Sequence, residues 1–127
     1  MYIRETLLSN NLIELYAKGQ RVFAGIELVE NENLETLDLS DSIFEESFLS
    51  CINFQKANLN NVAFRNCNLK CSDFRYADLT NAIIENCSVE ATSFKGAKID
   101  GLRFSNNGYY GVTLNQDDFE TNLSKAE

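Results

Sequence analysis

The chain has 127 residues, a formal net charge of −8 and a sequence pI near 4.5, and it contains no histidine, proline or tryptophan. Its length suits one domain, so residues 1–127 are treated as a single unit. The negative charge argues against direct binding to nucleic acid phosphates or to an anionic membrane, and the lack of histidine removes the commonest general base and metal ligand.

The first segment, residues 1–19, is predicted to cap the N-terminal end of the fold. Apolar residues at helical spacing predict a helix from Ser9 to Lys18, with one face formed by Leu8, Leu12, Leu15 and Tyr16. Ser9 or Asn10 is suited to cap its start and Gly19 to end it. A helix that docks on a partner is the alternative. Because residues 1–8 lack the apolar core of a signal peptide and no run is long enough to span a bilayer, we expect a cytoplasmic protein.

A five-residue repeat begins after this cap. Phe23 and Leu28 are five residues apart, but Leu34 follows Leu28 by six, so one extra residue is expected within Val29–Asn33 as a bulge or loosened corner. Charge is concentrated here, in eight acids without a base that we predict to form an acidic patch: Glu27, Glu30, Glu32, Glu35, Asp38, Asp41, Glu45 and Glu46. Residues 56–103, by contrast, hold seven bases and five acids.

From Leu34 onward a bulky apolar residue, here called a centre, occupies every fifth position. The eighteen centres are Leu34, Leu39, Phe44, Leu49, Phe54, Leu59, Phe64, Leu69, Phe74, Leu79, Ile84, Val89, Phe94, Ile99, Phe104, Tyr109, Leu114 and Phe119. A period of five fits neither a helix nor a strand, so it predicts a stacked solenoid whose coil holds a multiple of five residues. A buried helix or a coiled coil would need a period near 3.5.

Two further columns accompany the centres. Two residues before each centre the side chain is small or apolar, as at Ala57 and Cys67, which indicates an inward position. Two residues after it, asparagine or glycine recurs, as at Asn61 and Gly96; both tolerate positive φ, which predicts the third residue of a type II turn. Between residues 39 and 79 the centres alternate Leu and Phe, so four pentapeptides per coil would stack Phe on Phe. The pattern therefore favours a four-sided prism with twenty residues per coil.

The repeat relaxes toward the C-terminus. Ser105–Gly111 contains two glycines and two tyrosines, which predicts a distorted corner with an outward tyrosine. We expect the β-helix to cover residues 20–119 and residues 120–127 to form a short C-terminal cap or tail, with Phe119 and Leu123 closing the last coil.

The pentads Ala57–Asn61 and Ala77–Asn81 fit the pattern A-(D/N)-L-x-x, in which the chain resembles the pentapeptide repeat family. Leu15–Phe23 also looks like the capping segment that precedes the repeats in many members. The resemblance covers about four-fifths of the chain. It implies a β solenoid, specifically a right-handed quadrilateral β-helix with an N-terminal α-helical cap, in agreement with a twenty-residue coil.

The four cysteines form two pairs twenty residues apart. Cys51 and Cys71 fall in the outward turn column, and Cys67 and Cys87 fall in the inward column, where cysteine behaves as a small hydrophobe. Each pair should stack on successive coils about 4.8 Å apart. That spacing permits a disulfide, but parallel side chains meet its torsion poorly, and a four-cysteine metal site lacks a C-x-x-C pair. We therefore expect structural cysteines, with no metal and no cofactor.

A straight prism offers flat faces, and no catalytic motif is visible, so we expect neither catalytic residues nor enzymatic activity. A possible interaction surface is predicted at Ile43, Phe48, Ile83, Tyr76 and Tyr110. A basic row around Tyr76, formed by Lys56, Arg75 and Lys95, would suggest nucleic acid by itself, but the overall charge argues against it.

Two functional hypotheses remain. The first is a structural or interaction module, a monomeric rigid rod that presents flat faces to an unidentified protein. The second comes from the resemblance: pentapeptide repeat proteins that confer quinolone resistance resemble duplex DNA in width and charge and bind DNA gyrase. The net charge of −8 fits this DNA mimic. The confinement of the acids to the first coil and the lack of an apolar C-terminal dimerisation helix argue against it.

Overall fold

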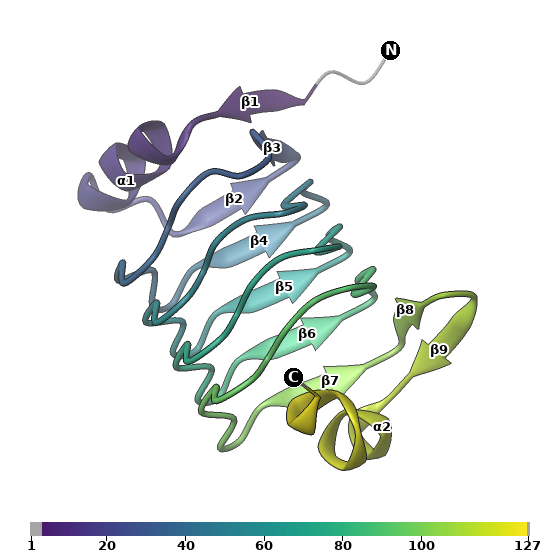
Figure 1. Cartoon of the computed structure of the whole chain (residues 1–127). Helices are drawn as coiled ribbons and strands as arrows, with labels where there is room; N and C mark the ends of the chain where they lie inside the picture. Colours follow the sequence, from purple (N-terminus) through teal and green to yellow (C-terminus); the bar gives the residue numbers. More distant parts are fainter. Residues whose placement is uncertain (1–3, 127) are drawn as a thin grey trace.

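The computed structural model describes residues 4–126, which form a four-sided prism with a helix at each end (Figure 1). One side is a parallel sheet of five short strands, one from each coil, in the order β2-β4-β5-β6-β7. These strands are β2 (Val22–Ala24), β4 (Ile43–Glu45), β5 (Ala63–Arg65), β6 (Ile83–Glu85) and β7 (Arg103–Ser105). We call this the first side.

The register confirms the predicted coil of twenty residues. On the first side Phe44 pairs with Phe64, and Phe64 with Ile84. The other three sides are held by isolated bridges with the same spacing: Phe48 to Asn68 on the second side, Asn53 to Asp73 on the third and Asn58 to Asp78 on the fourth.

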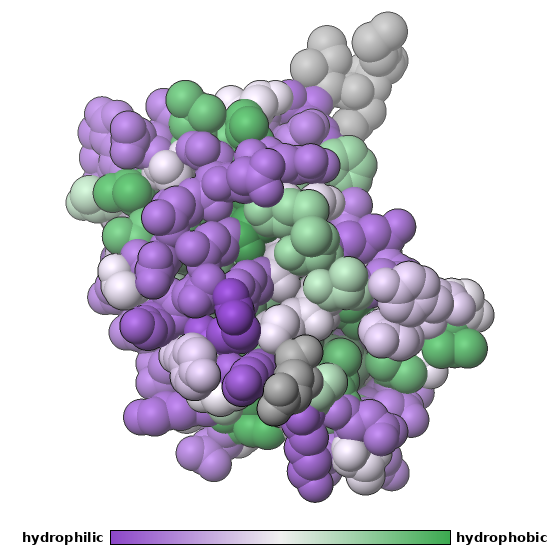
Figure 2. Space-filling model, in the orientation of Figure 1, coloured by the Kyte–Doolittle hydropathy of each residue, from purple (hydrophilic) through white to green (hydrophobic). Residues whose placement is uncertain are grey.

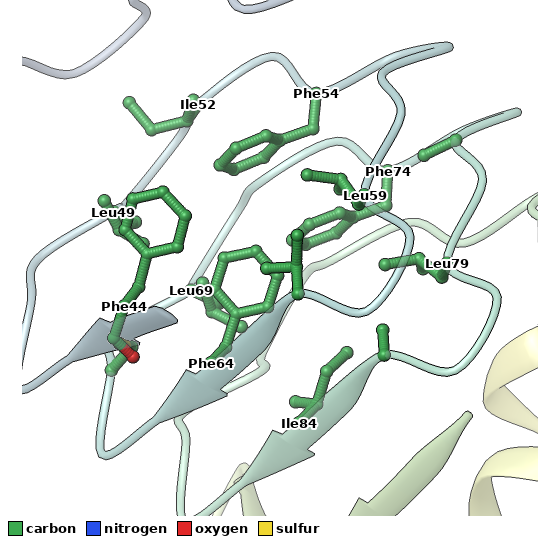
Figure 3. Close-up of a cluster of buried hydrophobic side chains, with 14 of the residues drawn as sticks. Phe44, Leu49, Ile52, Phe54, Leu59, Phe64, Leu69, Phe74, Leu79 and Ile84 are labelled. Atoms are coloured by element: carbon green, nitrogen blue, oxygen red, sulfur yellow. The ribbon is translucent and has the colours of Figure 1, made fainter. Parts of the chain in front are cut away.

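The centres fill the axis of the prism. Those from Leu34 to Phe94 are each at most 1% exposed. Phenylalanines stack between coils as predicted: the ring centroids of Phe44 and Phe64 lie 5.4 Å apart and those of Phe54 and Phe74 lie 4.9 Å apart (Figure 3). Offset stacking of this kind adds to the free energy gained by burying the rings.

The corners have the predicted backbone conformation. The residue two places after a centre has positive φ at every corner from Thr36 to Asn106, including side chains as large as Lys56 and Tyr76. At corners such as Phe54–Ala57, the amide of Ala57 donates to the carbonyl of Phe54 at 3.1 Å, as in a type II turn. Packing of the core on both sides of the corner imposes the positive φ even on residues that, unlike glycine or asparagine, do not favour it.

At the corner after the first side, side chains take part in the hydrogen bonding. The Phe44 carbonyl accepts from Cys67 Sγ at 3.2 Å, and the Phe64 carbonyl accepts from Cys87 Sγ at 3.3 Å. One coil later Asn107 Nδ2 donates to the Ile84 carbonyl at 2.9 Å. The two buried cysteines are therefore hydrogen-bond donors as well as the small hydrophobes that the sequence predicted.

The N-terminal end is closed by α1 (Ser9–Ala17) and by β1 (Glu5–Leu7), which pairs with β3 (Ile26–Leu28). The helix was predicted over nearly these bounds, but the prediction that Ser9 or Asn10 is its N-cap is wrong. Leu8 is the N-cap. The amides at the helix start donate to side chains instead: Leu8 N to Asn11 Oδ1 at 2.9 Å and Ser9 N to Glu32 Oε1 at 2.6 Å.

The extra residue lies where the sequence predicted it. Glu27 pairs with Phe48, twenty-one residues on, whereas Asn33 pairs with Asn53, twenty residues on. The additional residue therefore lies between Glu27 and Asn33, consistent with the predicted segment Val29–Asn33.

The C-terminal end departs from the predicted β-helix over residues 20–119. After β8 (Asn107–Tyr109) the chain turns at Tyr110 and Gly111 and returns antiparallel as β9 (Val112–Leu114). It then forms α2 (Gln116–Thr121) and the 3₁₀ turn η1 (Leu123–Lys125). The regular coils thus end at Tyr109, and Phe119 keeps the five-residue spacing from within a helix.

Side chains of this C-terminal segment replace the missing next coil. Gln116 accepts from the Phe104 amide at 2.6 Å and donates to the Leu102 carbonyl at 3.0 Å. The Phe119 ring stacks on Phe104 at 4.7 Å and covers the open end of the core. The last strand edge of the first side is therefore covered, which protects it from pairing with another chain.

Candidate interaction surface

The structure places the five residues of the predicted interaction surface on separate parts of the prism. Ile43 and Ile83 lie on the first side and are half-buried, with the buried Ala63 between them. Arg65 and Glu85 follow in the next outward row and form an ion pair, with Nε and Oε1 2.8 Å apart. This apolar row is therefore narrow and flanked by charge.

Phe48 and Tyr76 each contact a neighbour that covers part of the ring. The Arg4 guanidinium lies 3.7 Å from the centroid of the Phe48 ring, within cation–π range. Tyr76, at the corner between the third and fourth sides, lies against Gly96 of the next coil, where a Cβ would overlap the tyrosine ring. Both remain partly exposed, at 42% and 52%.

The eight acids of the predicted acidic patch form a ring. Because one coil has twenty residues and the acids span Glu27 to Glu46, they are distributed two to each side. In side order from the second side they are Glu27 and Glu30, Glu32 and Glu35, Asp38 and Asp41, and Glu45 and Glu46. We call this set the acidic ring.

Two members of the acidic ring have local structural roles. Glu32 accepts from the first turn of α1, where the helix dipole favours a negative charge. Hydrogen bonds from the backbone and the side chain of Ser40 hold the pKa of Asp38 below its usual range. The ring therefore contributes to the structure of the N-terminal end as well as to its charge.

Charges in the middle of the prism are paired. Besides Arg65 and Glu85, Lys70 Nζ lies 3.6 Å from Glu90 Oε2 on the next coil, and Arg75 Nη2 lies 2.7 Å from Asp73 Oδ2. Although burial alone would raise the pKa of Asp73, hydrogen bonds and charge from Arg75 hold that pKa below its usual value.

The β8–β9 hairpin projects from the body of the prism (Figure 2). It carries the two most exposed large apolar side chains of the described residues 4–126, Tyr110 at 66% and Val112 at 57%. Tyr110 was among the predicted residues. Val112 was missed because it lies on an irregular segment where the repeat gives no indication of orientation.

A mainly apolar hollow of about 320 Å³ lies between the hairpin and the C-terminal helices. We call it the C-terminal groove; it is lined by Tyr109, Val112, Leu114, Asp118, Asn122, Leu123 and Ala126. The groove exists because the chain reverses direction between β8 and β9, and the five-residue repeat does not predict this reversal.

Strand β9, whose Val112 and Leu114 side chains line this groove, has an outer edge that is unpaired within the described part of the chain. Gly108 of β8 hydrogen-bonds to the preceding coil, donating to the Cys87 carbonyl and accepting from the Val89 amide. In an antiparallel pair the bonding direction alternates, so Thr113, opposite Gly108, directs its N–H and C=O away from β8. Within residues 4–126 no strand pairs with β9 on that edge.

The described residues hold no convergent set of ligands for a metal ion. Over residues 4–126 no three Cys, Asp or Glu side chains come together in a suitable cluster. In the same part of the chain, neither helix has the length and apolar character needed to cross a membrane.

Comparison with known families supports the repeat assignment. Residues 22–94, more than half of the chain, match the family described as a pentapeptide repeat region. The chain belongs to the pentapeptide repeat family. A comparison of this pentapeptide repeat protein with curated protein sequences finds no match.

Solved structures show the same fold at low identity. Rfr23, a pentapeptide repeat protein from the cyanobacterium Cyanothece 51142, is similar with a TM-score of 0.65 and 17% identity over 84% of this chain and 82% of its own. Two trypsin-treated structures of QnrB1, a plasmid-mediated fluoroquinolone resistance protein, give TM-scores of 0.61 and 0.60 at 21% and 24% identity. The two matches cover 75% and 69% of this chain. They cover 46% and 49% of the QnrB1 chains, so this chain spans about half the length of QnrB1.

Proposed function

We propose that this pentapeptide repeat protein is a non-catalytic protein-interaction module that binds its partner through the C-terminal groove and the hairpin tip. The observation that carries the proposal is that the two most exposed large apolar side chains of residues 4–126, Tyr110 and Val112, project beside a mainly apolar groove. Exposed apolar patches of this kind mark interaction sites in soluble proteins. Backbone hydrogen bonds between Gly108 of β8 and the preceding coil, to Cys87 and Val89, hold the hairpin in place.

The chemistry of the groove favours an extended segment of the partner with apolar and basic residues. The free N–H and C=O of Thr113 suit the addition of a strand to the edge of β9, and an apolar side chain would enter the groove. Asp117 and Asp118 lie in the first turn of α2, and Asp118 lines the groove. A lysine or arginine beside the apolar residue would complement these carboxylates.

The DNA-mimic alternative has weaker support. Duplex DNA carries a negative charge about every 1.7 Å along its axis. Here the acidic ring surrounds one coil, and the ion pairs of Arg65, Lys70 and Arg75 balance charge farther along. In a supercoiling assay with DNA gyrase we expect no inhibition at micromolar protein. Inhibition there would replace the proposed function with the mimic.

The interaction proposal is tested by affinity capture from an extract of the source organism. A Tyr110→Ser/Val112→Ser variant should lose a partner that the wild-type protein retains. A Val22→Ser/Tyr76→Ser variant removes two comparably exposed apolar side chains elsewhere and should retain it. Equal retention by the hairpin variant would contradict the proposal.

A second copy of the chain is a competing occupant of the β9 edge. We expect a monomer, because the exposed apolar surface beside the groove comes mainly from two side chains, Tyr110 and Val112, whereas a stable dimer interface buries about 1,200–2,000 Å² in total. Sedimentation equilibrium would show this as a single species of 14.4 kDa. A dimer that the Tyr110→Ser/Val112→Ser variant abolishes would identify self-association as the role of this surface.

A further inference from the structure

Cys51 and Cys71 occupy equivalent corners of two adjacent coils. The Cys51 amide donates to the Lys70 carbonyl at 2.9 Å, so the two backbones are in direct contact at this corner. Both residues have positive φ, 56° and 65°, and their side chains therefore leave the corner in the same manner. Both thiols are free.

The two side chains are neighbours at this corner. A hydrogen bond to the Cys71 side chain, followed by partial burial, raises the pKa of Cys51 to about 11. Strand spacing of about 4.8 Å places the two Cα atoms within the range that a disulfide requires. Because the two side chains leave their corners in parallel, the bond forms only after one of them rotates, and the exposed Cys71 side chain has room to do so.

This pair differs from Cys67 and Cys87 in its access to solvent. Cys71 is exposed and Cys51 half-buried, whereas Cys67 and Cys87 are both 3% exposed and bonded to backbone carbonyls. Cys71 also borders an open hollow of about 470 Å³ on the third side, lined by Asp73, Arg75 and Lys95 among others. A small reagent can therefore reach Cys71 from solvent.

We propose that Cys51 and Cys71 form a dithiol site that is oxidised by low-molecular-weight disulfides, with Cys71 as the attacking thiol and Cys51 as the resolving thiol. The Cys71 thiolate attacks one sulfur of the external disulfide, forms a mixed disulfide and releases one thiolate. The Cys51 sulfur, after losing its proton to solvent, attacks the Cys71 sulfur, forms the Cys51–Cys71 disulfide and releases the second thiolate. Two protein thiols are oxidised by two electrons while the reagent is reduced to two thiols.

The test exposes the folded protein to oxidised glutathione, quenches with acid, alkylates the remaining thiols and measures intact and peptide masses. The wild-type protein should lose about 2 Da without retaining glutathione, and the peptides that contain Cys51 and Cys71 should be linked. Cys67 and Cys87 should be alkylated only after unfolding, which provides an internal control. Cys51→Ser should stop at the mixed disulfide on Cys71, and Cys71→Ser should react at least about tenfold more slowly.

Two results would overturn the proposal. One is a wild-type protein that accumulates the mixed disulfide to the same extent as Cys51→Ser, since Cys51 would then not resolve it. The other is a wild-type protein in which both thiols remain open to alkylation after a treatment that fully oxidises free dithiothreitol. Far-UV circular dichroism of each variant confirms that the comparison is made between folded proteins.

Discussion

Truncation of one central ring tests the packing of the coils. Phe64 is fully buried; its ring stacks on Phe44 at 5.4 Å and meets Phe54 and Phe74 edge-on at 5.9 Å and 5.8 Å. The backbone on all sides is fixed by hydrogen bonds between coils, so the cavity left by Phe64→Ala cannot collapse. We expect a loss of about 3–5 kcal/mol in the free energy of unfolding. At roughly 0.27 kcal/mol per kelvin for a chain of this length, the melting temperature falls by about 11–19 °C.

The adjacent outward residue provides the matched control. Arg65→Ala removes an ion pair whose side chains are 33% and 36% exposed, and such pairs contribute at most about 1 kcal/mol. The expected change in melting temperature is below about 4 °C. Urea denaturation monitored by circular dichroism gives both free energies. Comparable losses for the two variants would refute the inward assignment of Phe64 and the register derived from it.

Three further predictions concern the end, a corner and the charges. Gln116→Ala leaves the Phe104 amide and the Leu102 carbonyl without their side-chain partner and should lower the free energy of unfolding by about 1–3 kcal/mol, measured by urea denaturation. An unchanged midpoint would show that water replaces the side-chain amide. Gly96→Ala should lower the melting temperature, because its Cβ would overlap the Tyr76 ring and its φ is +71°; the double variant with Tyr76→Ser should recover part of the loss. Arg75 lowers the folded-state pKa of Asp73, so that contribution to stability is present above about pH 4 and is lost as the pH falls through the folded pKa. Asp73→Asn should therefore destabilise the protein at pH 7 and destabilise it less as the pH falls below about 4, and an effect that does not change with pH would contradict this assignment.

Much of the fold follows from the sequence because its period is set by geometry. A corner every five residues and an inward side chain at each centre predict a coil made of pentapeptides. The alternation of Leu and Phe predicts that each coil holds twenty residues. Even the insertion near Val29 is visible as a single six-residue step. The predicted coil and register are correct wherever a pentapeptide has another coil on each side of it.

The C-terminal end was not predictable from the repeat. Phe119 continues the five-residue spacing, yet it lies in a helix, because a residue that covers the last coil must also be apolar. The side-chain bonds of Gln116 to the last strand edge have no sequence signature of their own. The C-terminal groove forms where this cap meets the hairpin, and its location therefore required the three-dimensional structure.

The acidic ring illustrates a different limit. Eight acids in twenty residues suggest a patch in the sequence, but wrapping them once around the prism leaves two on each side. A charge cluster becomes a surface patch in a solenoid only when its members recur at the coil period. The same reasoning identifies Cys51 and Cys71 as neighbours.

Site-specific photo-crosslinking tests the proposed interaction surface most directly. A photoreactive amino acid placed at Tyr110 should give one discrete adduct with a partner protein in an extract of the source organism. The same amino acid at Tyr76, which is also exposed but lies at a corner in the middle of the prism, should not give that adduct. An adduct of equal yield from both positions, or from Tyr76 alone, would contradict binding through the hairpin and the C-terminal groove.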